Sequence, residues 1–448
     1  MKFKIKIMII VSFVVIVSMS FFIVHSNPIS LSVIQPDNVI TGSNNSYLIT
    51  LKGVPSGNGT YQQLLTINNY SKYGINDNGS NIEFFDYSNY THLYAWIQSI
   101  NSSTLTIWIK NYNDSSFIDI QVLSKVENLF SVKGYLGEAP QLSSVYAEYS
   151  GNAYKIFSQF DDFTNISGWT TSNTSLDYAN NGLYMLSGPS LISDNTYNFE
   201  GHSFVFYGEF INQSSANIPT DTTYIYASIG SDYYNRFMFG NGNYGWGYYI
   251  YNNTNGHQFT YRNFDSLDSL YSITPYYSNS SAQFSVNGVS TTVSYNSVVY
   301  QNQSLDFNNF NCYNVRIGPI YYEFITQIPL SSMPTFTVGS SIYHSIDFKL
   351  LGSPFSSLWN IMVNGTTYQA DSSNIYLNMT NGYYNIIVNL PAGYSAITKG
   401  VLYVNGTNQV YKIFVSYNNN SGISNDIIYA IILASIIVAA AIYFSKRS

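Results

Sequence analysis

The sequence predicts an all-β protein made of tandem β-sandwich modules, and three observations support this. Charged residues are 9% of the chain, against about 25% in typical soluble domains. Polarity comes instead from Asn, Ser, Thr and Tyr, with 44 Tyr in 448 residues. Short alternating apolar and polar runs, such as residues 104–110, recur between Asn, Gly and Ser; this alternation is typical of half-buried strands.

The N-terminal residues 1–26 are predicted to be a signal peptide or an uncleaved signal anchor. Lys2, Lys4 and Lys6 precede an apolar run at residues 7–24, and the small residue Ser26 fits a cleavage site,. The apolar run is longer than usual for a signal peptide, so both alternatives stay open.

Residues 427–445 are predicted to form a transmembrane helix. The apolar run at 427–444 is long enough, at about 1.5 Å per residue, to approach the roughly 30 Å of a hydrocarbon core,. The basic pair Lys446-Arg447 in the tail 446–448 favours a cytoplasmic C-terminus. The predicted location is therefore the cell membrane, with the body of the chain extracellular.

Three β modules are predicted between these ends, at residues 27–151, 152–330 and 331–417, followed by a polar linker at 418–426. Asn287-Gly288, Asn364-Gly365 and Asn405-Gly406 each lie between strand-like runs. Because Asn-Gly favours the positive φ angles of a type I′ turn, each pair predicts a hairpin.

Several motifs occur in a characteristic order. The first module holds residues 61–67, 79–84, 93–97, 107–110 and 134–137; the second opens with the FDDF segment 160–163 and Gly168-Trp169, and continues with 181–184 and 315–318; the third holds 359–365, 381–384, 390–394 and 404–406. This order resembles archaeal and bacterial surface proteins that combine an uncharacterised β domain, a concanavalin-like (laminin-G-like) jelly roll and a small Ig-like repeat. The resemblance implies surface location and sandwich folds, and no established activity.

Net charge and cysteine content exclude several classes of function. A net charge of −7 without a Lys/Arg patch gives no indication of a nucleic-acid partner,. Cys312 is the single cysteine, so neither an intrachain disulfide nor a thiolate metal site is expected, and it is interpreted as a small core residue,. The five scattered His residues have no zinc-binding spacing,.

Glycosylation is expected because Asn-X-Ser/Thr sequons are dense and the chain is predicted to be extracellular. The candidates are Asn44, Asn58, Asn69, Asn78, Asn89, Asn101, Asn113, Asn165, Asn173, Asn212, Asn252, Asn279, Asn302, Asn364, Asn378, Asn405 and Asn419.

The predicted ligand-binding residues are Trp246, Tyr244, Tyr248 and Tyr249, in a Gly-rich stretch of the jelly roll. Aromatic rings offer a surface on which sugars stack, whereas the alternative is that these rings fill the sandwich core. The formal G-x-G-x-x-G match at residues 240–245 precedes a strand-like run rather than a helix, so a dinucleotide site is not predicted.

No catalytic residue is predicted. Glycan hydrolysis needs two carboxyl groups flanking the bond; Glu200 with Glu209, or Asp265 with Asp268, would have to be brought together by folding. No cofactor is predicted, although structural Ca²⁺ is considered because the oxygen-rich residues include Asp161, Asp162, Asp306, Asn308 and Asn311,. Turn capping is the alternative role of these side chains.

The predicted function is recognition or adhesion: a membrane-anchored surface glycoprotein whose jelly roll engages glycans or neighbouring envelope proteins. A structural spacer of the envelope is the alternative, and a glycan-active enzyme is the second alternative. The absence of linear catalytic motifs predicts that the chain is not an enzyme.

A surface with few charges should change little on acidification, because few carboxylates must be protonated when the chain unfolds,. We therefore expect an acid-living, archaeal host, and unfolding midpoints at pH 2 and pH 7 that are similar. A collapse of the midpoint at pH 2 would favour the other interpretation, a low-GC genome that enriches Asn, Tyr and Ile.

Overall fold

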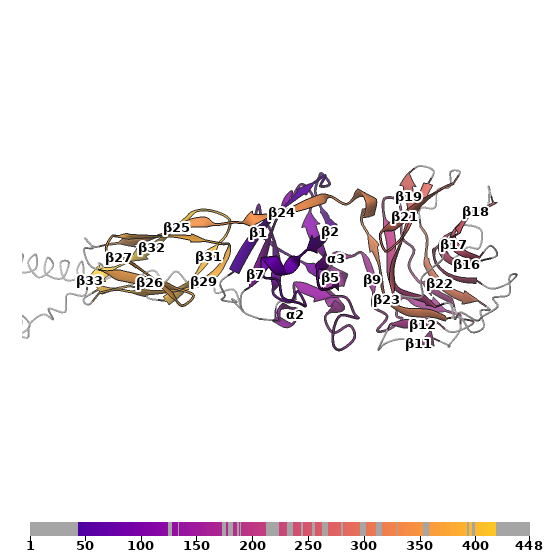
Figure 1. Ribbon diagram of the computed structural model, residues 1–448, viewed down its shortest axis with the longest axis horizontal. Coiled ribbons are helices and arrows are strands. Elements are labelled where there is room, and N and C mark those ends of the chain that lie inside the picture. Colours follow the sequence, from indigo (N-terminus) through magenta and orange to yellow (C-terminus); the bar gives the residue numbers. More distant parts are fainter. Residues whose placement is uncertain are drawn as a thin grey trace, which may run out of the picture. The chain divides into compact units, whose positions relative to one another are not determined.

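The computed structural model is nearly all β, which confirms the predicted fold class (Figure 1). It describes residues 44–417 with gaps at 124–127, 133, 173–175, 178–181, 186–187, 189, 212–223, 231–235, 243–244, 253–255, 262–267, 279–280, 296–301, 311–315, 329, 353–357, 392–393 and 397–398. The predicted signal and transmembrane segments and Cys312 lie outside the described residues. In the described part of the chain, none of the helices has the length and apolarity that a membrane span requires.

The first module contains two sheets. One has the order β24-β1-β7-β3-β4 and the other β2-β6-β5-β8. Their strands are β1 (Asn44–Lys52), β2 (Thr60–Asn68), β3 (Ile82–Asp86), β4 (His92–Leu93), β5 (Ala95–Ile100), β6 (Thr104–Tyr112), β7 (Phe117–Leu123), β8 (Leu136–Glu138) and β24 (Thr335–Ser341). Short helices accompany them: η1 (Tyr70–Tyr73), α2 (Leu129–Val132), η2 (Ser150–Asn152) and α3 (Ala153–Ile156).

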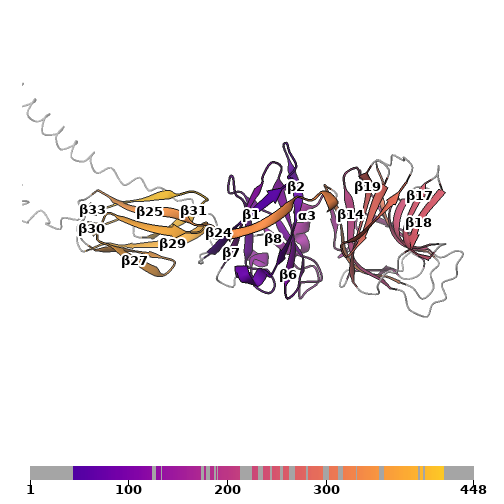
Figure 2. The ribbon, with the colours of Figure 1, turned by 45° about the horizontal axis from the view of Figure 1, so that its top comes forward.

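Strand β24 follows the jelly roll in sequence but pairs antiparallel with β1 of the first module (Figure 2). The predicted boundary at residue 331 assigns this segment to the third module. In the structure the jelly roll is therefore an insertion between strands that share one sheet, with η3 (Leu330–Ser332) just before the chain returns.

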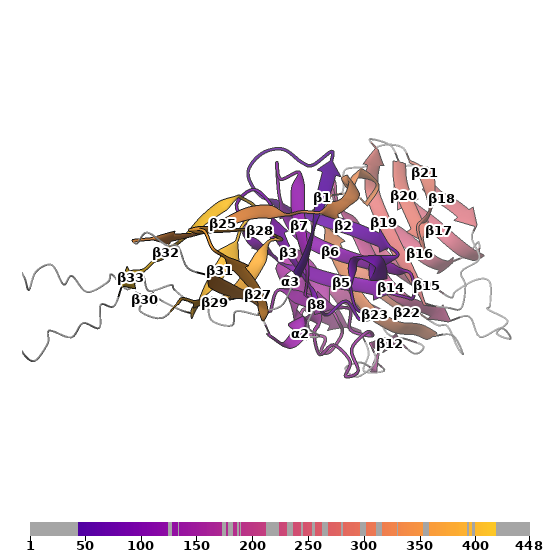
Figure 3. The ribbon, with the colours of Figure 1, turned by 60° about the vertical axis from the view of Figure 1, so that its left-hand side comes forward.

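The jelly roll packs a seven-stranded sheet, β10-β13-β22-β15-β16-β17-β18, against an eight-stranded one, β11-β12-β23-β14-β19-β20-β21 with β9 added beside β23 (Figure 3). One core cluster contains apolar residues of both sheets, including Phe206 and Phe307. The strands are β9 (Gln159–Asp161), β10 (Trp169–Thr171), β11 (Leu176–Asp177), β12 (Leu183–Met185), β13 (Ser190–Ser193), β14 (Ser203–Ile211), β15 (Tyr224–Ile229), β16 (Arg236–Gly242), β17 (Gly245–Asn252), β18 (Gly256–Tyr261), β19 (Ser269–Ser278), β20 (Ser281–Val286), β21 (Val289–Ser294), β22 (Leu305–Phe310) and β23 (Arg316–Thr326).

The third module packs the sheet β28-β25-β32 on the sheet β27-β26-β29-β31 around Trp359 and Phe348. A small ladder of β30 and β33 completes it. Its strands are β25 (His344–Leu351), β26 (Trp359–Val363), β27 (Thr366–Ala370), β28 (Asn374–Met379), β29 (Gly382–Asn389), β30 (Tyr394–Ser395), β31 (Lys399–Val404), β32 (Gln409–Phe414) and β33 (Ser416–Tyr417).

Two of the three predicted Asn-Gly hairpins form. Asn287-Gly288 joins β20 to β21 and Asn364-Gly365 joins β26 to β27, with positive φ at both residues of each pair. The prediction at Asn405-Gly406 is wrong, because this pair connects β31 to β32, which belong to different sheets. An Asn-Gly turn forms a hairpin only where the two strands that flank it pair with each other. The sequence does not show which sheet the second strand joins.

The outer side of the β9–β23 pair packs on the first module. Phe160 and Phe324 occupy opposite positions in this antiparallel ladder. Both contribute to a cluster with Trp96 and Trp108 of the first module, in which the Phe157 and Phe324 rings stack at 4.0 Å between centroids. Trp108 Nε1 also donates a hydrogen bond of 2.6 Å to Gln98 Oε1. These contacts hold the jelly roll against the first module.

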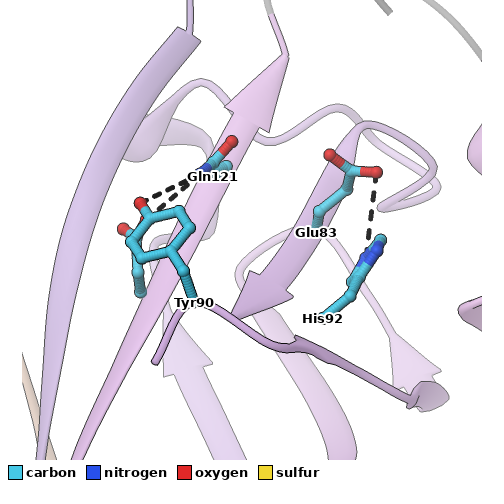
Figure 4. A network of polar contacts seen from close by, with 5 residues as sticks. Glu83, Tyr90, His92 and Gln121 are labelled. Carbon is cyan, nitrogen blue, oxygen red and sulfur yellow. Dashed lines mark hydrogen bonds and ion pairs between the residues drawn. The ribbon is translucent and has the colours of Figure 1, made fainter. Parts of the chain in front are cut away.

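Polar side chains of the first module form a hydrogen-bonded network around the buried Asp119 (Figure 4). Tyr90 donates to Asp119 Oδ2 at 2.5 Å, and the Gln121 amide donates to both residues at 3.2 Å. Asn381 of the third module donates to the same Asp119 oxygen at 3.2 Å. Burial raises the pKa of Asp119. The network therefore joins the first and third modules through one buried carboxyl group.

Replacing Phe324 by Ala should destabilise the contact between the first module and the jelly roll. The change removes a fully buried ring beneath both Trp residues, and such cavities typically cost about 3–5 kcal/mol,. In calorimetry, F324A should lower the unfolding temperature and split the jelly-roll transition from that of the first module. The control Phe117→Ala, at a 44% exposed ring, should change little; equal effects of the two would contradict this account.

Candidate functional site

A polar pocket lies at the edge of the jelly roll and encloses about 170 Å³. This is smaller than the roughly 300–1,000 Å³ of sites for drug-sized ligands, so it suits one small polar unit. Among the described residues that line the pocket, Asp161 is the one with an acidic side chain, and none has a basic one. The lining combines four aromatic rings with amide, hydroxyl and carboxyl groups: Tyr154, Gln159, Phe160, Asp161, Asn165, Ser167, Gly168, Trp169, Asn195 and Tyr197.

Strand alternation places the carboxyl group of Asp161 in this pocket. Its neighbour Phe160 points outward to the first module, so Asp161 points to the inner face of the sheet,. Trp169 Nε1 donates to Asp161 Oδ2 at 2.6 Å, and the Phe163 backbone N–H donates to Oδ1 at 2.7 Å. Burial nevertheless raises the pKa of Asp161 to about 6. The group therefore changes its charge near the lower end of the physiological range.

Glu323 lies directly opposite Asp161 in the β9–β23 ladder. Opposite positions place Cβ atoms about 4.5–5.5 Å apart on one face of the sheet. The side chain is fully buried, and burial together with the Asp161 charge raises its pKa well above the usual value. Glu323 Oε2 has no hydrogen-bond partner among the described residues. Burial and the neighbouring Asp161 carboxylate therefore both disfavour ionisation of Glu323,.

A chain of hydrogen bonds links Glu323 to the pocket wall. Tyr197 donates its hydroxyl proton to Gln159 Oε1 at 2.8 Å, and Gln159 Nε2 donates to Glu323 Oε1 at 2.9 Å. The Gln159 amide thus connects the Tyr197 hydroxyl to the buried Glu323 carboxyl group. The back of the pocket is thus a rigid polar surface.

The rim of the pocket carries an exposed aromatic ring. Tyr154 is 52% exposed and packs edge-on against Phe160, with 5.0 Å between ring centroids. One face of its ring is therefore available to the apolar C–H surface of a ligand. Asn165, also exposed at the pocket, belongs to a predicted sequon, so a glycan attached there would start at the pocket itself.

Most of the predicted sequons that the structure describes are exposed. Asn113 and Asn364 are partly buried, and the side chains of Asn44 and Asn252 are not described. Outside the described residues lie Asn173, Asn212, Asn279 and Asn419; the exposed ones are Asn58, Asn69, Asn78, Asn89, Asn101, Asn165, Asn302, Asn378 and Asn405.

The predicted aromatic surface around Trp246 is not brought together. Tyr248 is 1% exposed in the jelly-roll core, whereas Tyr249 is fully buried in a separate cluster with Tyr226 and Met238. Consecutive strand residues point to opposite faces, so these two rings cannot offer one surface to a sugar. Trp246 lies in β17 opposite Asn241, but its side chain and all of Tyr244 lie outside what the structure describes.

The calcium candidates are also separated. Asp162 caps the following turn, accepting bonds from the Thr164 backbone N–H at 3.1 Å and from the Ser150 hydroxyl at 2.6 Å. Asp306 lies in β22 of the other sheet, 1% exposed, with burial raising its pKa to about 7 and the Arg236 cation lowering it. Within the described ranges no three His, Cys, Asp or Glu side chains are grouped as a metal site requires. Asn311 lies outside them.

The carboxyl pairs considered from the sequence do not form a hydrolytic site in the described residues. Ser203 and Glu209 are six residue steps apart along β14, about 20 Å of strand,. Glu209 is therefore far from Glu200, which precedes the strand. Asp265 is not described, and Asp268 is exposed. The pair that does form, Asp161 with Glu323, joins positions 162 residues apart, and no local motif indicated it.

His92 and Glu83 form a second cluster of titratable groups, 3.8 Å apart. Figure 4 shows the two side chains facing each other. The His92 ring stacks between Phe85 and Tyr135, and the adjoining cavity holds only about 10 Å³. That volume suffices for one water molecule at most, so this cluster is structural.

Comparisons with known proteins identify only distant fold similarities. No protein-family model and no curated protein matches the chain. Similar solved structures, each covering 38% of this chain, include a glycosyl hydrolase family protein from Mycobacterium fortuitum (12% identity, 99% of that chain, TM-score 0.27) and a beta-1,3-glucanase from Mycobacterium marinum (13%, 98%, 0.27). The carbohydrate recognition domain of Emp46p is another, at 10% identity over 93% of that chain and a TM-score of 0.28.

One prediction needs correction. Glycosyl hydrolases and a carbohydrate recognition domain both occur among the similar structures. The prediction that the chain is not an enzyme is wrong as an exclusion, because it rests on the absence of a linear motif, and the fold pairs the carboxyl groups of Asp161 and Glu323 without one. Identities and TM-scores this low carry no information about activity.

The buried carboxyl groups predict that stability rises on mild acidification. Burial raises the pKa of Asp119, Glu138, Asp161, Asp268, Asp306 and Glu323, and it lowers that of His202 and His344. A raised carboxyl pKa means that the folded state binds more protons than the unfolded chain between about pH 4 and 7, so stability is lost as pH rises through that window. The two His residues act in the opposite sense.

Thermal unfolding should therefore occur at a higher temperature at pH 4.5 than at pH 7.5. Asp161→Asn, which removes one of these titrations, should reduce the difference. Asp371→Asn, at an exposed residue, should leave it unchanged. A midpoint that falls steadily between pH 7.5 and pH 4.5 would contradict this interpretation of the carboxyl groups.

Proposed function

We propose that the jelly roll recognises a neutral glycan by taking one sugar residue into the pocket around Asp161. The observation that carries this proposal is the combination of a buried carboxylate, oriented amides and an exposed aromatic ring in one small cavity. Sugars offer hydroxyl groups to such acceptors and C–H faces to aromatic rings. No cation lines the pocket among its described residues, which favours a neutral ligand over an acidic one.

Each group has a separate part in this proposal. The ionised Asp161 accepts hydroxyl hydrogen bonds, which are stronger to a charged acceptor than to a neutral one. Asn195 and Asn165 supply further donors and acceptors at the wall, and the Tyr154 ring covers one sugar face. The hydrogen bond between Tyr197 and Gln159 orders the back of the pocket before the ligand arrives, so little conformational entropy is lost on binding,.

Glycan cleavage is the second candidate function, and the pairing of Asp161 with Glu323 favours it. Retaining glycosidases hold two carboxyl groups about 5–5.5 Å apart, and opposite ladder positions meet that range at Cβ. Glu323 is sealed behind Asp161, however, so the pair supports cleavage less directly than binding. An envelope spacer without a ligand remains the alternative in which the pocket stays unused.

The proposed location of the chain rests on the sequence alone. In this proposal, residues 427–445 anchor the protein in the cell membrane and the three modules stand outside the cell. The jelly roll is then presented to glycans of neighbouring cells or of the envelope, which fits recognition or adhesion.

A glycan array should detect binding by the full-length protein, produced without glycosylation so that Asn165 is unmodified. Asp161→Asn should weaken binding about tenfold or more, the typical loss for a hydrogen bond to a charged group. Tyr154→Ala should also weaken it. Wild-type affinity should fall as pH decreases through about 6, because Asp161 then becomes neutral.

The controls separate the alternatives. Tyr376→Ala removes an exposed Tyr outside the pocket (67% exposed) and should leave binding unchanged. Loss of binding in Trp246→Ala alone would instead assign the ligand to the surface predicted from the sequence. Release of reducing ends from a bound glycan, abolished by Asp161→Asn and by Glu323→Gln, would establish cleavage. A folded wild-type protein that binds nothing would overturn the proposal in favour of the spacer.

A further inference from the structure

One end of the third module gathers the ends of several strands. Strands β25 and β32 run parallel and finish together, with Leu351 opposite Phe414. Trp359, which starts β26, donates its indole proton to the Ser372 carbonyl at 2.7 Å, and the adjoining Ser373 carbonyl accepts from the Leu350 backbone N–H. The start of β26 is therefore at the same end as the finish of β25.

The last described strand is also at this end. Val415 donates its backbone N–H to the Leu351 carbonyl at 2.8 Å, and β33 (Ser416–Tyr417) follows directly. Figure 2 shows β30 and β33 together at one end of the module. The chain thus leaves the third module at the end defined by Leu351, Leu358 and Phe414.

This end exposes two large apolar side chains. Phe414 is 72% exposed and Leu358 is 68% exposed, more than the other large apolar residues of the described chain. Neither side chain contributes to the module's core, which closes over Trp359 and Ile413 beside them. Exposing these apolar surfaces to water is unfavourable in free energy, and neither side chain contributes to the packing of the module,.

The linker places this end close to the predicted membrane span. Nine residues, 418–426, separate β33 from the apolar run at 427–444. Fully extended they reach about 32 Å at most, and as a flexible chain they span about 16 Å on average. The headgroup region of a bilayer is only several ångströms thick on each side, so the exposed side chains lie within reach of the lipid.

We propose that this end of the third module docks on the bilayer, with Leu358 and Phe414 inserted into the headgroup–acyl boundary. The proposal rests on the membrane anchor proposed above and adds an orientation to it. Two inserted apolar side chains fix the module against the lipid, and the modules before it are then held at a defined angle rather than swinging on the linker. Lys399 and Lys412, exposed nearby, are long enough to reach the headgroups.

Spin labels in the full-length chain test this. The single natural cysteine is replaced by Cys312→Ser, and cysteine is introduced one site at a time as Leu358→Cys, Phe414→Cys and Tyr343→Cys. Tyr343, 60% exposed just before β25 begins, is a matched control at the opposite end of the same module. Each labelled protein is reconstituted in phosphatidylcholine vesicles, and collisions of the label with oxygen and with a water-soluble nickel complex are compared.

Labels at 358 and 414 should collide several-fold more with oxygen, relative to nickel, than the label at 343, and high salt should not remove the difference. Vesicle-bound protein whose labels at 358 and 414 are as accessible to nickel as the label at 343 would overturn the docking and leave the anchor intact. Protein that does not stay with the vesicles would overturn the anchor and the docking together. Glycan binding in detergent is a separate readout, so its failure would concern only the pocket.

Discussion

The pairing of β9 with β23 is the contact on which both the arrangement of the modules and the candidate site depend. Its outward residues, Phe160 and Phe324, pack under Trp96 and Trp108 and hold the jelly roll to the first module. Its inward residues, Asp161 and Glu323, form the back of the pocket. Because alternate residues of one strand pair serve both purposes, a shift of register by one position would lose the module contact and the pocket together.

The second constraint on the structure is its scarcity of charged residues, which are 9% of the chain. Six carboxyl groups, five of them buried, have raised pKa values, and only for Asp306 is a cation, Arg236, among the groups that shift the pKa in the described chain. Neutral donors replace cations elsewhere, as Tyr90, Gln121 and Asn381 do around Asp119. Burial favours the protonated form of these carboxyl groups, so the folded state should be more stable in mildly acidic solution than at neutral pH. Burial likewise raises the pKa of Asp161 in the pocket to about 6, and the proposed ligand is accordingly neutral and rich in hydroxyl groups.

The sequence predicted the fold class because composition and alternation are local signals. Trp96, Trp108 and Trp359, which lie in the motif runs quoted from the sequence, are buried. It identified Asp161 and Trp169 as parts of an opening motif, but not their contact with each other. Glu323 could not be found, since ladder register between distant strands is not encoded in local pattern. The surface around Trp246 was predicted from clustering in sequence, which ignores that Tyr248 and Tyr249 point to opposite faces. The pairing of β24 with β1 of the first module was not predicted either, because pairing between strands that are far apart in sequence leaves no local pattern.

If Asp161 titrates in a glycan-binding pocket, the indole N–H of Trp169 should report on it directly, because this N–H donates to the Asp161 carboxylate. The most direct measurement is a pH titration of the Trp169 indole resonance by NMR, assigned with Trp169→Phe, in the absence and presence of a glycan. The account predicts a midpoint near pH 6 without ligand and a lower midpoint with it, since the bound hydroxyls stabilise the ionised form. A resonance that neither titrates between pH 4 and 8 nor responds to any glycan would contradict it.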